Sequence, residues 1–240
     1  MILKAAACTD VGLRRSENED RYALAPHLGL YLVADGMGGH SAGQVASQLA
    51  AEASLQAIET LEGAEVSLAE KLREAVASAN RAIFASATDH PEYAGMGTTL
   101  VALLAGGERA ALAHVGDSRA YRVRRGRIRL LTDDHSIVGE LLRRREISED
   151  DAREHPHRHV LTRALGVRRH VEPDLAELTP EAGDVFVLCS DGLTTHVDDE
   201  EICRIVAEGT DLQKASESLV HLANDRGGED NTTVVLARCE

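Results

Sequence analysis

The stretch VADGMGGHSAGQVA, residues 33 to 46, places a carboxylate between a predicted strand and a predicted helix. The apolar run at 29–34 is typical of a buried strand, and Asp35 follows it directly. Beyond the glycines, apolar residues recur from Ala42 to about Leu61 at the three- and four-residue spacings of a helix. An Asp-Gly pair after a strand usually forms an ordinary turn, so Asp35 taken alone indicates no particular chemistry.

The composition is that of a soluble globular protein, with 240 residues of which 43% are hydrophobic and 28% charged. The net charge of −14 argues against a nucleic-acid partner, because such binding normally uses a basic stripe. No run approaches ~18 apolar residues, and the first residues lack the core of a signal peptide, so we expect a cytoplasmic protein without membrane contact. Four cysteines without CxxC spacing indicate reduced thiols.

The hydrophobic period changes along the chain. Helical spacing predicts two helices near the N-terminus, the second capped by Ser67, and two near the C-terminus, with spans of 42–61, 68–83, 198–208 and 212–222. Short apolar runs predict strands at 2–9, 29–34, 171–178, 184–190 and 231–238, and a β-meander at 97–106, 109–116, 119–126 and 128–131. Residues 132–170 are polar and irregular. We therefore expect one α+β domain over 1–240, with mostly antiparallel sheets, and a monomer.

Five acidic residues share one local context: Asp20, Asp35, Asp117, Asp191 and Asp230. Four of them follow or precede an apolar strand directly, beside Gly, Ser or Asn. Strand ends of one sheet lie near each other, so these carboxylates could converge. Carboxylates packed together repel and resist desolvation, so a convergent cluster needs cations. An all-oxygen donor set favours Mg²⁺ or Mn²⁺ over zinc, which prefers His and Cys.

Eight motifs occur along the chain in a fixed order: TDVGLRRSENEDR, VADGMGGH, GTTLVALL, AHVGDSRAYR, TDDHS, HPHRHVLTRALG, LCSDGL and GGEDNTTVV. In these motifs and their order the chain resembles the bacterial type 2C phosphatases, the metal-dependent serine/threonine protein phosphatases of the PPM family. The resemblance extends from about Ala6 to Ala237. It implies a four-layer α/β/β/α sandwich of two antiparallel sheets flanked by helix pairs, with a flap segment at about 132–170.

The resemblance also implies metal ligands at the acidic positions. Asp35 would bridge two ions, and the Gly36 carbonyl would bind the second. Asp191 and Asp230 would complete the protein ligands of the first ion. Asp20 would hold the second ion directly or through water.

Further positions match the third ion site and the substrate site of this family. Asp117 matches the acidic residue of a third, weaker metal site, which would share Asp191. Arg15 lies where the family places the arginine that binds substrate phosphate. His40 is a candidate general acid for the leaving oxygen or a helper to the third ion, although a histidine capping the following helix explains it equally well. Asn231 is interpreted as orienting Asp230 or a metal-bound water, or as a turn residue.

The implied reaction is hydrolysis of phosphoserine and phosphothreonine in proteins. Two Mn²⁺ or Mg²⁺ ions, with a possible third, would bridge a water and lower its pKa, so that hydroxide attacks phosphorus in line. Arg15 would orient the phosphate through its planar fork. Proteins phosphorylated by a Ser/Thr protein kinase are the implied partners.

Three alternatives are set against this interpretation. An inactive family member acting as a phosphoprotein-binding regulatory module would have lost metal aspartates, but Asp35, Asp191 and Asp230 are all present. Cys8 and Arg14 have the C-x5-R spacing of cysteine-dependent phosphatases, but Asp10 would put a carboxylate in that anion loop. Zinc could bind the histidines at 155, 157 and 159, with His135 nearby, but Pro156 interrupts such a strand, which favours surface or substrate-facing roles.

Overall fold

Two antiparallel sheets form the centre of the molecule, which is a computed structural model that describes residues 3–39 and 42–240. The first sheet has the order β1-β11-β10-β7-β8, with bounds β1 Leu3–Asp10, β7 Arg119–Arg124, β8 Arg127–Leu130, β10 Val185–Cys189 and β11 Thr232–Cys239. The second has the order β2-β3-β5-β6-β9, with bounds β2 Asp20–Ala25, β3 Leu30–Met37, β5 Leu100–Gly106, β6 Arg109–Val115 and β9 Asp174–Leu178; the short β4, Gly97–Thr98, pairs with β3.

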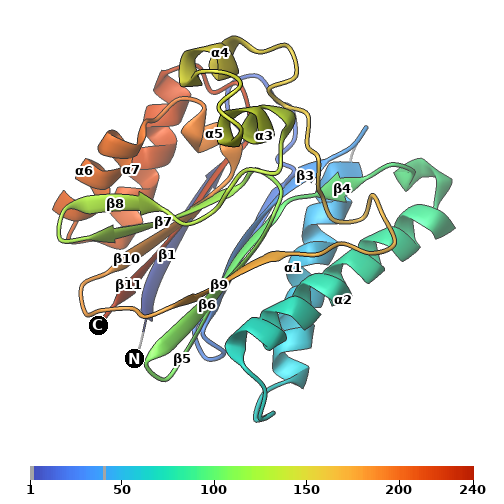
Figure 1. Cartoon of the computed structure of the whole chain (residues 1–240), viewed down its shortest axis with the longest axis horizontal. Helices are drawn as coiled ribbons and strands as arrows, with labels where there is room; N and C mark the ends of the chain where they lie inside the picture. The colour runs from blue at the N-terminus through green and yellow to red at the C-terminus, as the bar shows by residue number, and fades with distance from the viewer. Residues whose placement is uncertain (1–2, 40–41) are drawn as a thin grey trace.

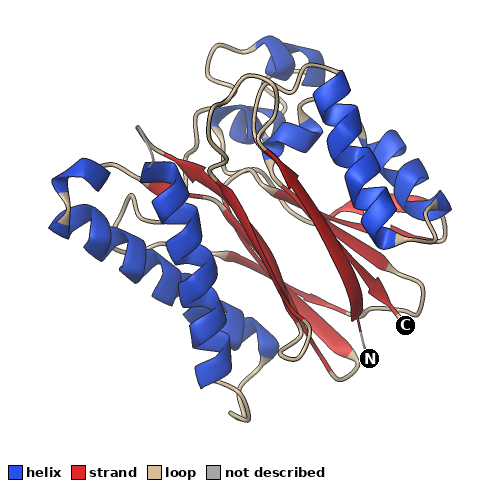
Figure 2. Ribbon diagram, turned by 180° about the vertical axis from the view of Figure 1, so that it is seen from behind, coloured by secondary structure: helices blue, strands red, loops and turns tan. Residues whose placement is uncertain are grey.

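The helices cover the outer faces of the two sheets (Figures 1 and 2). The pair α1 (Ala42–Thr60) and α2 (Leu68–Asp89) lies on the second sheet, and α6 (Asp199–Glu208) with α7 (Leu212–Asp225) lies on the first. Shorter elements complete the fold: the 3-10 turn η1 (Pro91–Tyr93), α3 (Ile137–Arg143), α4 (Glu149–Glu154) and α5 (Asp191–Thr194). The expected α/β/β/α sandwich is confirmed.

The core has three apolar layers, as a four-layer sandwich requires. Between the sheets, the largest fully buried side chains are Tyr31 and Phe186, packed among leucines and valines of both sheets. Each helix pair has its own layer against the outer face of a sheet. The buried face of α1 is built mostly from small residues, which lets the helix approach β2 and β3 closely. The near absence of aromatic residues is thus compatible with a continuous core.

The helix predictions are confirmed, including the cap of α2, where the Ser67 hydroxyl accepts a hydrogen bond from the Glu70 amide. The strand β2 and the helix α3 were not predicted. The β-meander prediction is wrong, because β6 pairs within the second sheet and β7 within the first. The chain crosses between the sheets at Gly116, which has φ +111° and leaves no room for a Cβ beside Thr99.

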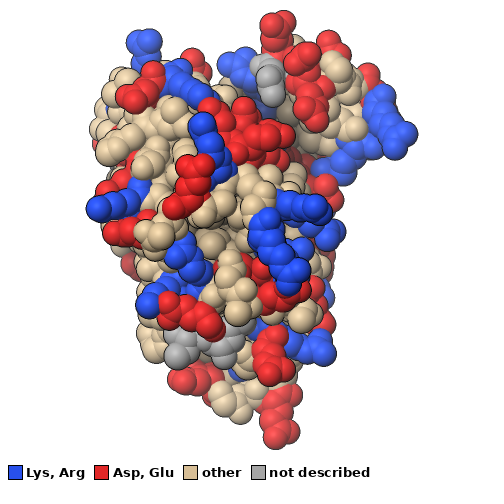
Figure 3. Space-filling view, turned by 90° about the vertical axis from the view of Figure 1, so that its left-hand side faces the viewer, with Lys and Arg blue, Asp and Glu red and all other residues tan. Residues whose placement is uncertain are grey.

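Charged side chains of both signs are interspersed over the face that lies at the left of Figure 1, and no continuous basic stripe crosses that face (Figure 3). None of the helices within the described residues has the length and apolar character needed to cross a membrane.

The inter-sheet layer predicts a large stability cost for truncation of Phe186, which is 1% exposed. Phe186→Ala should lower the free energy of unfolding by about 3–5 kcal/mol, because it removes buried area and leaves a cavity between the sheets. Urea unfolding followed by circular dichroism measures this. Val66→Ala, at a position 47% exposed, is the matched control and should change stability by less than about 0.5 kcal/mol. Equal losses in the two variants would contradict the layer described.

Candidate metal centre and substrate cleft

The five predicted carboxylates gather at one end of the sandwich, although they come from five separate segments of the chain. Asp20 opens β2 and lies opposite Asp35 of β3 in the antiparallel register. Asp117 lies in the crossing between the sheets, Asp191 begins α5, and Asp230 precedes β11. A cleft of about 450 Å³ is lined by the last four of these residues, with Asp20 beneath it at 1% exposure. A larger cavity of about 600 Å³, between the edge strands β8 and β9, shares no lining residue with the cleft.

The backbone at Asp35 is fixed by the threonine pair before β5. The Asp35 amide donates to Thr99 Oγ1 at 3.0 Å, and its carbonyl accepts from the Thr99 amide at 2.9 Å and from Thr98 Oγ1 at 2.8 Å. The next residue must be glycine, because a Cβ on Gly36 would lie 2.0 Å from the carbonyl oxygen of Gly43. These contacts leave the Asp35 carboxylate free to face the cleft.

Asp20 is held from below by the end of β10. Ser190 Oγ donates to Asp20 Oδ2 at 2.7 Å and accepts from the Thr233 amide at 2.9 Å. Asp20 Oδ1 is buried and has no hydrogen-bond partner among the described residues. Burial, together with repulsion from Asp191 and Asp230, raises the pKa of Asp20 to about 7. Asp20 is therefore a desolvated carboxyl that has one unpartnered oxygen.

The neighbouring carboxyls are also desolvated and repelled by one another. Burial and mutual repulsion raise the pKa values of Asp35 and Asp117 well above the ordinary range, and the pKa of Asp191 is also raised. Asp191 Oδ1, like Asp20 Oδ1, is buried without a partner. A divalent cation would offset both the burial and the repulsion, and an oxygen-only donor set suits Mg²⁺ or Mn²⁺. The residues present therefore fit the ions that the sequence predicted.

Arg15 lies at the rim of this cleft, where Arg15 Nη2 donates to Asp230 Oδ2 at 2.7 Å. Its side chain is 51% exposed, so it can also meet a ligand that enters from solvent. His40, the predicted general acid, lies outside the described residues.

The side chain of Asn231 does not orient Asp230, which was one of its predicted roles. Its side chain does not bond Asp230; instead its Nδ2 donates to the carbonyls of Val11 and Glu17 at 2.9 and 3.0 Å, and its Oδ1 accepts from the Glu19 amide at 2.8 Å. Only the backbone amide of Asn231 bonds Asp230 Oδ1. The side chain thus fixes the loop that carries Arg15, through partners more than 200 residues away in the sequence.

The segment 132–170 lies over one side of the cleft, where His159 and Leu161 contribute to the lining. His157 is exposed, whereas His135 is buried, which corrects its expected surface role. Within the described residues, 155, 157 and 159 do not form a metal-binding group. Several cleft residues were given no role by the sequence interpretation, among them Thr99, whose GTT motif was noted, and His196, which lies in none of the quoted motifs.

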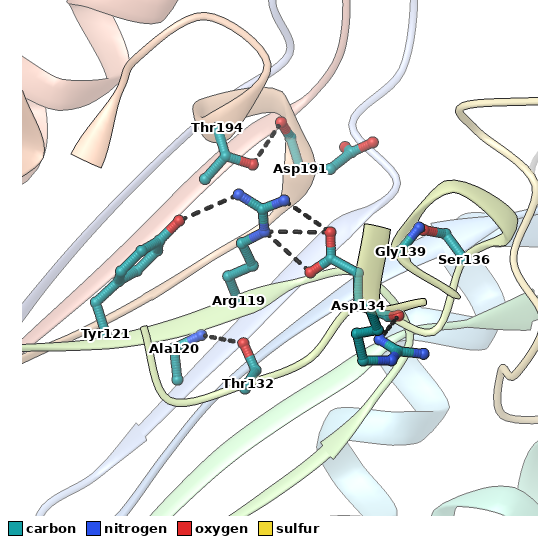
Figure 4. Close-up of polar contacts among 10 residues, drawn as sticks. Arg119, Ala120, Tyr121, Thr132, Asp134, Ser136, Gly139, Asp191 and Thr194 are labelled. Atoms are coloured by element: carbon teal, nitrogen blue, oxygen red, sulfur yellow. Dashed lines mark hydrogen bonds and ion pairs between the residues drawn. The ribbon is translucent and has the colours of Figure 1, made fainter. Parts of the chain in front are cut away.

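An ion pair between β7 and the loop that follows β8 anchors the start of this segment (Figure 4). Arg119 on β7 donates through Nε and Nη2 to the Asp134 carboxylate at 2.9 and 2.7 Å, and its Nη1 contacts the Tyr121 hydroxyl at 3.3 Å. Asp134 is close enough to Asp117 and Asp191 to raise their pKa values further. The Arg119 fork thus offsets one more carboxylate at the edge of the centre.

The cysteine alternative is contradicted by the structure. Cys8 lies within β1, and all four cysteines are unpaired. Burial, with Glu217 and Asp10 nearby, raises the pKa of the Cys8 thiol, whereas a nucleophilic cysteine needs a lowered pKa.

Comparison with known proteins gives consistent matches along the chain. The family model described as Protein phosphatase 2C matches residues 9–232. Serine/threonine protein phosphatase PstP of Mycobacterium tuberculosis is 42% identical over 238 residues, which are 99% of this chain and 45% of that protein. Serine/threonine phosphatase stp of Listeria welshimeri is 40% identical over 95% of this chain and 92% of its own length. The chain therefore spans less than half of the mycobacterial relative.

Solved structures agree in fold. A crystal structure of the Mycobacterium tuberculosis phosphatase PstP/Ppp superposes with a TM-score of 0.92 at 40% identity, covering 100% of both chains. The catalytic domain of PstP in complex with two manganese ions gives a TM-score of 0.88 at 39% identity, covering 99% of this chain and 98% of that one.

The raised pKa values predict how the stability of the metal-free protein depends on pH. A carboxyl with a folded pKa near 7 keeps its proton in the folded state after the unfolded chain, with a pKa of about 3.9, has lost it. Its stabilising contribution is therefore lost as the pH rises through 7. In EDTA, the free energy of unfolding should fall between pH 6.5 and 8.5, by about 1 kcal/mol from Asp20 alone.

Urea unfolding at the two pH values measures this loss. Asp20→Asn should show a shallower pH dependence than the unaltered protein, and Mn²⁺ should reduce the loss at pH 8.5 because a cation offsets the repulsion. An unfolding free energy that rises over this interval in EDTA would refute the electrostatic description of the centre.

Proposed function

This chain belongs to the protein phosphatase 2C family, and from that premise we propose that it hydrolyses phosphoserine and phosphothreonine in proteins at a centre of two Mn²⁺ or Mg²⁺ ions. The observation that carries the proposal is the convergence of five carboxylates on one cleft with Arg15 at its rim. The relatives named above are serine/threonine phosphatases, and one of them binds two manganese ions.

The proposed ligands divide among the ions as follows. Asp35 would contribute to both core ions, Asp191 and Asp230 would complete the first, and the Gly36 carbonyl and Asp20 would hold the second. A third ion would be held by Asp117 together with Asp191. When bound, such ions activate a water for attack on phosphorus and offset the charge of the phosphoryl group.

The chain's own residues bind and orient the substrate. Arg15 releases Asp230 and turns its planar fork toward the phosphate oxygens, for which its geometry is suited. The hydrogen bond and charge of Asp230 raise the pKa of Arg15 before substrate binds, and a guanidinium stays positive at neutral pH even after it releases Asp230. His159 and Leu161 border the cleft on the side of the segment 132–170, where the peptide around the phosphorylated residue would lie. His40 remains the proposed general acid.

The lining of the cleft supports the substrate class. Arg15 and four of the five predicted aspartates line it, and the Arg15 side chain is 51% exposed, which suits a phosphorylated side chain presented on a protein surface. We propose phosphoproteins made by a Ser/Thr protein kinase as substrates, residues 1–240 as one catalytic domain with the flap at about 132–170, and a monomer as the active form. The alternative, a binding module without turnover, is disfavoured by the complete set of carboxylates and is an outcome of the test below.

Release of phosphate from a phosphothreonine peptide should require Mn²⁺ or Mg²⁺ and stop in EDTA. Asp35→Asn and Asp191→Asn should each lower kcat/KM by at least about 100-fold, because even the hydrogen-bond partners of metal ligands are worth 10- to 100-fold. Asp225→Asn, an exposed position on α7, is the matched control and should retain full activity. Turnover that persists in EDTA would reject the metal mechanism, and peptide binding without turnover in saturating Mn²⁺ would indicate the binding module.

Arg15 offers a separate test of substrate binding. Arg15→Ala should raise KM for the phosphopeptide by about tenfold, since a charge-assisted hydrogen bond contributes about 1.5–3 kcal/mol. Arg15→Lys should restore only part of the loss, because an ammonium group cannot bind two phosphate oxygens as a fork. Arg14→Ala, at the exposed neighbouring residue, controls for the local loss of charge. An unchanged KM in Arg15→Ala would remove Arg15 from the substrate site.

A further inference from the structure

A second group of ionisable side chains lies at the base of the segment 136–161 and has no role in the proposed reaction. His114 on β6, His135 and Asp174 on β9 have donor atoms that all lie within 4.8 Å of one another. The two histidines are 2% and 3% exposed, and their ring centroids are 4.5 Å apart. Such a trio has the composition of a metal site, so its hydrogen bonds decide what it does.

The hydrogen bonds of His135 argue against a metal at this position. The Gly116 amide donates to His135 Nδ1 at 3.1 Å, so Nδ1 holds a lone pair and the proton of the neutral ring is on Nε2. That proton faces Asp174 Oδ2 at 3.1 Å. A metal on Nε2 would force the proton onto Nδ1, directly against the Gly116 amide. Burial lowers the pKa of His135, which agrees with a neutral ring.

The His135 ring instead helps to hold the chain in place at Gly116, where it crosses between the two sheets. Besides accepting from the Gly116 amide, His135 donates its own amide to the Gly116 carbonyl at 2.7 Å, so the two residues are joined twice. On the opposite side, Thr99 Oγ1 bonds Ser118 Oγ at 2.6 Å and accepts from the Asp35 amide. The residue between these two attachments is Asp117.

The same histidine holds both ends of the segment above the cleft. The amide of Thr162 donates to the His135 carbonyl at 2.8 Å, and Arg163 Nη1 donates to Asp174 Oδ1 at 2.6 Å. Both ends of the segment 136–161 are therefore attached to the same hydrogen-bonded pair, His135 and Asp174. A shift of either end of this segment would strain the bond to Asp174 or the bond to Gly116.

We propose that His135 is a positioning residue that couples the segment 136–161 to the carboxylate of Asp117. The hydrogen bond at its Nδ1 fixes the position of the Gly116–Asp117 backbone. The hydrogen bond at its Nε2 fixes the position of the segment relative to Asp174. The position of the segment then controls the affinity of the Asp117–Asp191 pair for its cation, and a cation bound there stabilises the segment in return. The inference rests on the proposed function only in taking Asp117 as a ligand.

Two substitutions separate the two bonds. His135→Asn keeps an oxygen where Nδ1 accepts from Gly116 but cannot reach Asp174, whereas His135→Gln reaches Asp174 and gives up the Gly116 bond. Calorimetric titration with Mn²⁺ measures each binding step, and hydrogen exchange of the metal-free protein measures the mobility of residues 136–161. Neither measurement requires turnover, so failure of the phosphatase assay and failure of this inference remain distinguishable.

His135→Gln should weaken the weakest Mn²⁺ step by about tenfold, in the range found for residues behind metal ligands, with the tighter steps unchanged. His135→Asn should keep Mn²⁺ affinity within about threefold and should speed exchange in 136–161 by about tenfold. His157→Gln and His157→Asn are matched controls on an exposed histidine of the same segment and should change neither quantity. Equal effects in the two His135 variants would show a merely structural role and overturn the proposal.

The unaltered protein provides an independent test if a variant fails to fold. Nitrogen-15 spectra should show the His135 ring neutral, with its proton on Nε2, and Mg²⁺ should slow exchange of residues 136–161. A proton on Nδ1, Zn²⁺ or Mn²⁺ bound by the trio, no separable weak Mn²⁺ step, or exchange unaffected by Mg²⁺ would each refute the coupling.

Discussion

The repulsion among buried carboxylates at one end of the sandwich is the constraint on which the rest of the structure depends. Asp20 and Asp35 face each other across an antiparallel strand pair, and Asp191 and Asp230 enter from the other sheet. An isolated chain would not hold four such charges together, since each resists desolvation next to the others. Hydrogen bonds to the hydroxyls of Thr99 and Ser190 and the tight packing at Gly36 hold them there. The fold therefore holds carboxylates that repel one another, and bound cations would offset this repulsion.

Much of this arrangement could be predicted from the sequence because it is local. Helix periodicity located the two helix pairs, and the Ser67 cap follows from a pattern of four residues. The acidic strand ends share a context that is visible without a structure, and the motif order supplied the family and the layered fold. The carboxylates were thus identifiable before their distances were known. The burial that raises the pKa values of four of them could not be predicted; these four are Asp20, Asp35, Asp117 and Asp191.

What could not be predicted depends on contacts between distant parts of the chain. The runs at 109–116 and 119–126 look like one hairpin, because nothing in the letters shows that Gly116 carries the chain to another sheet. The side chain of Asn231 forms its hydrogen bonds with a loop more than 200 residues earlier in the sequence. His135 appears in a polar segment but is buried, since its partners on β6 and β9 come from the sheet beneath.

The place of β11 in the first sheet has a consequence for the order in which the protein folds during its synthesis. β11 is the last strand in the sequence, yet it lies between β1 and β10 and is the only partner of β1 among the described strands. Asp230 immediately precedes it. A chain emerging from the ribosome can form the second sheet and its helices early, but the first sheet cannot close before residues 232–239 have emerged. The set of five carboxylates is therefore assembled late in folding, when β11 pairs with β1 and brings Asp230 to the centre.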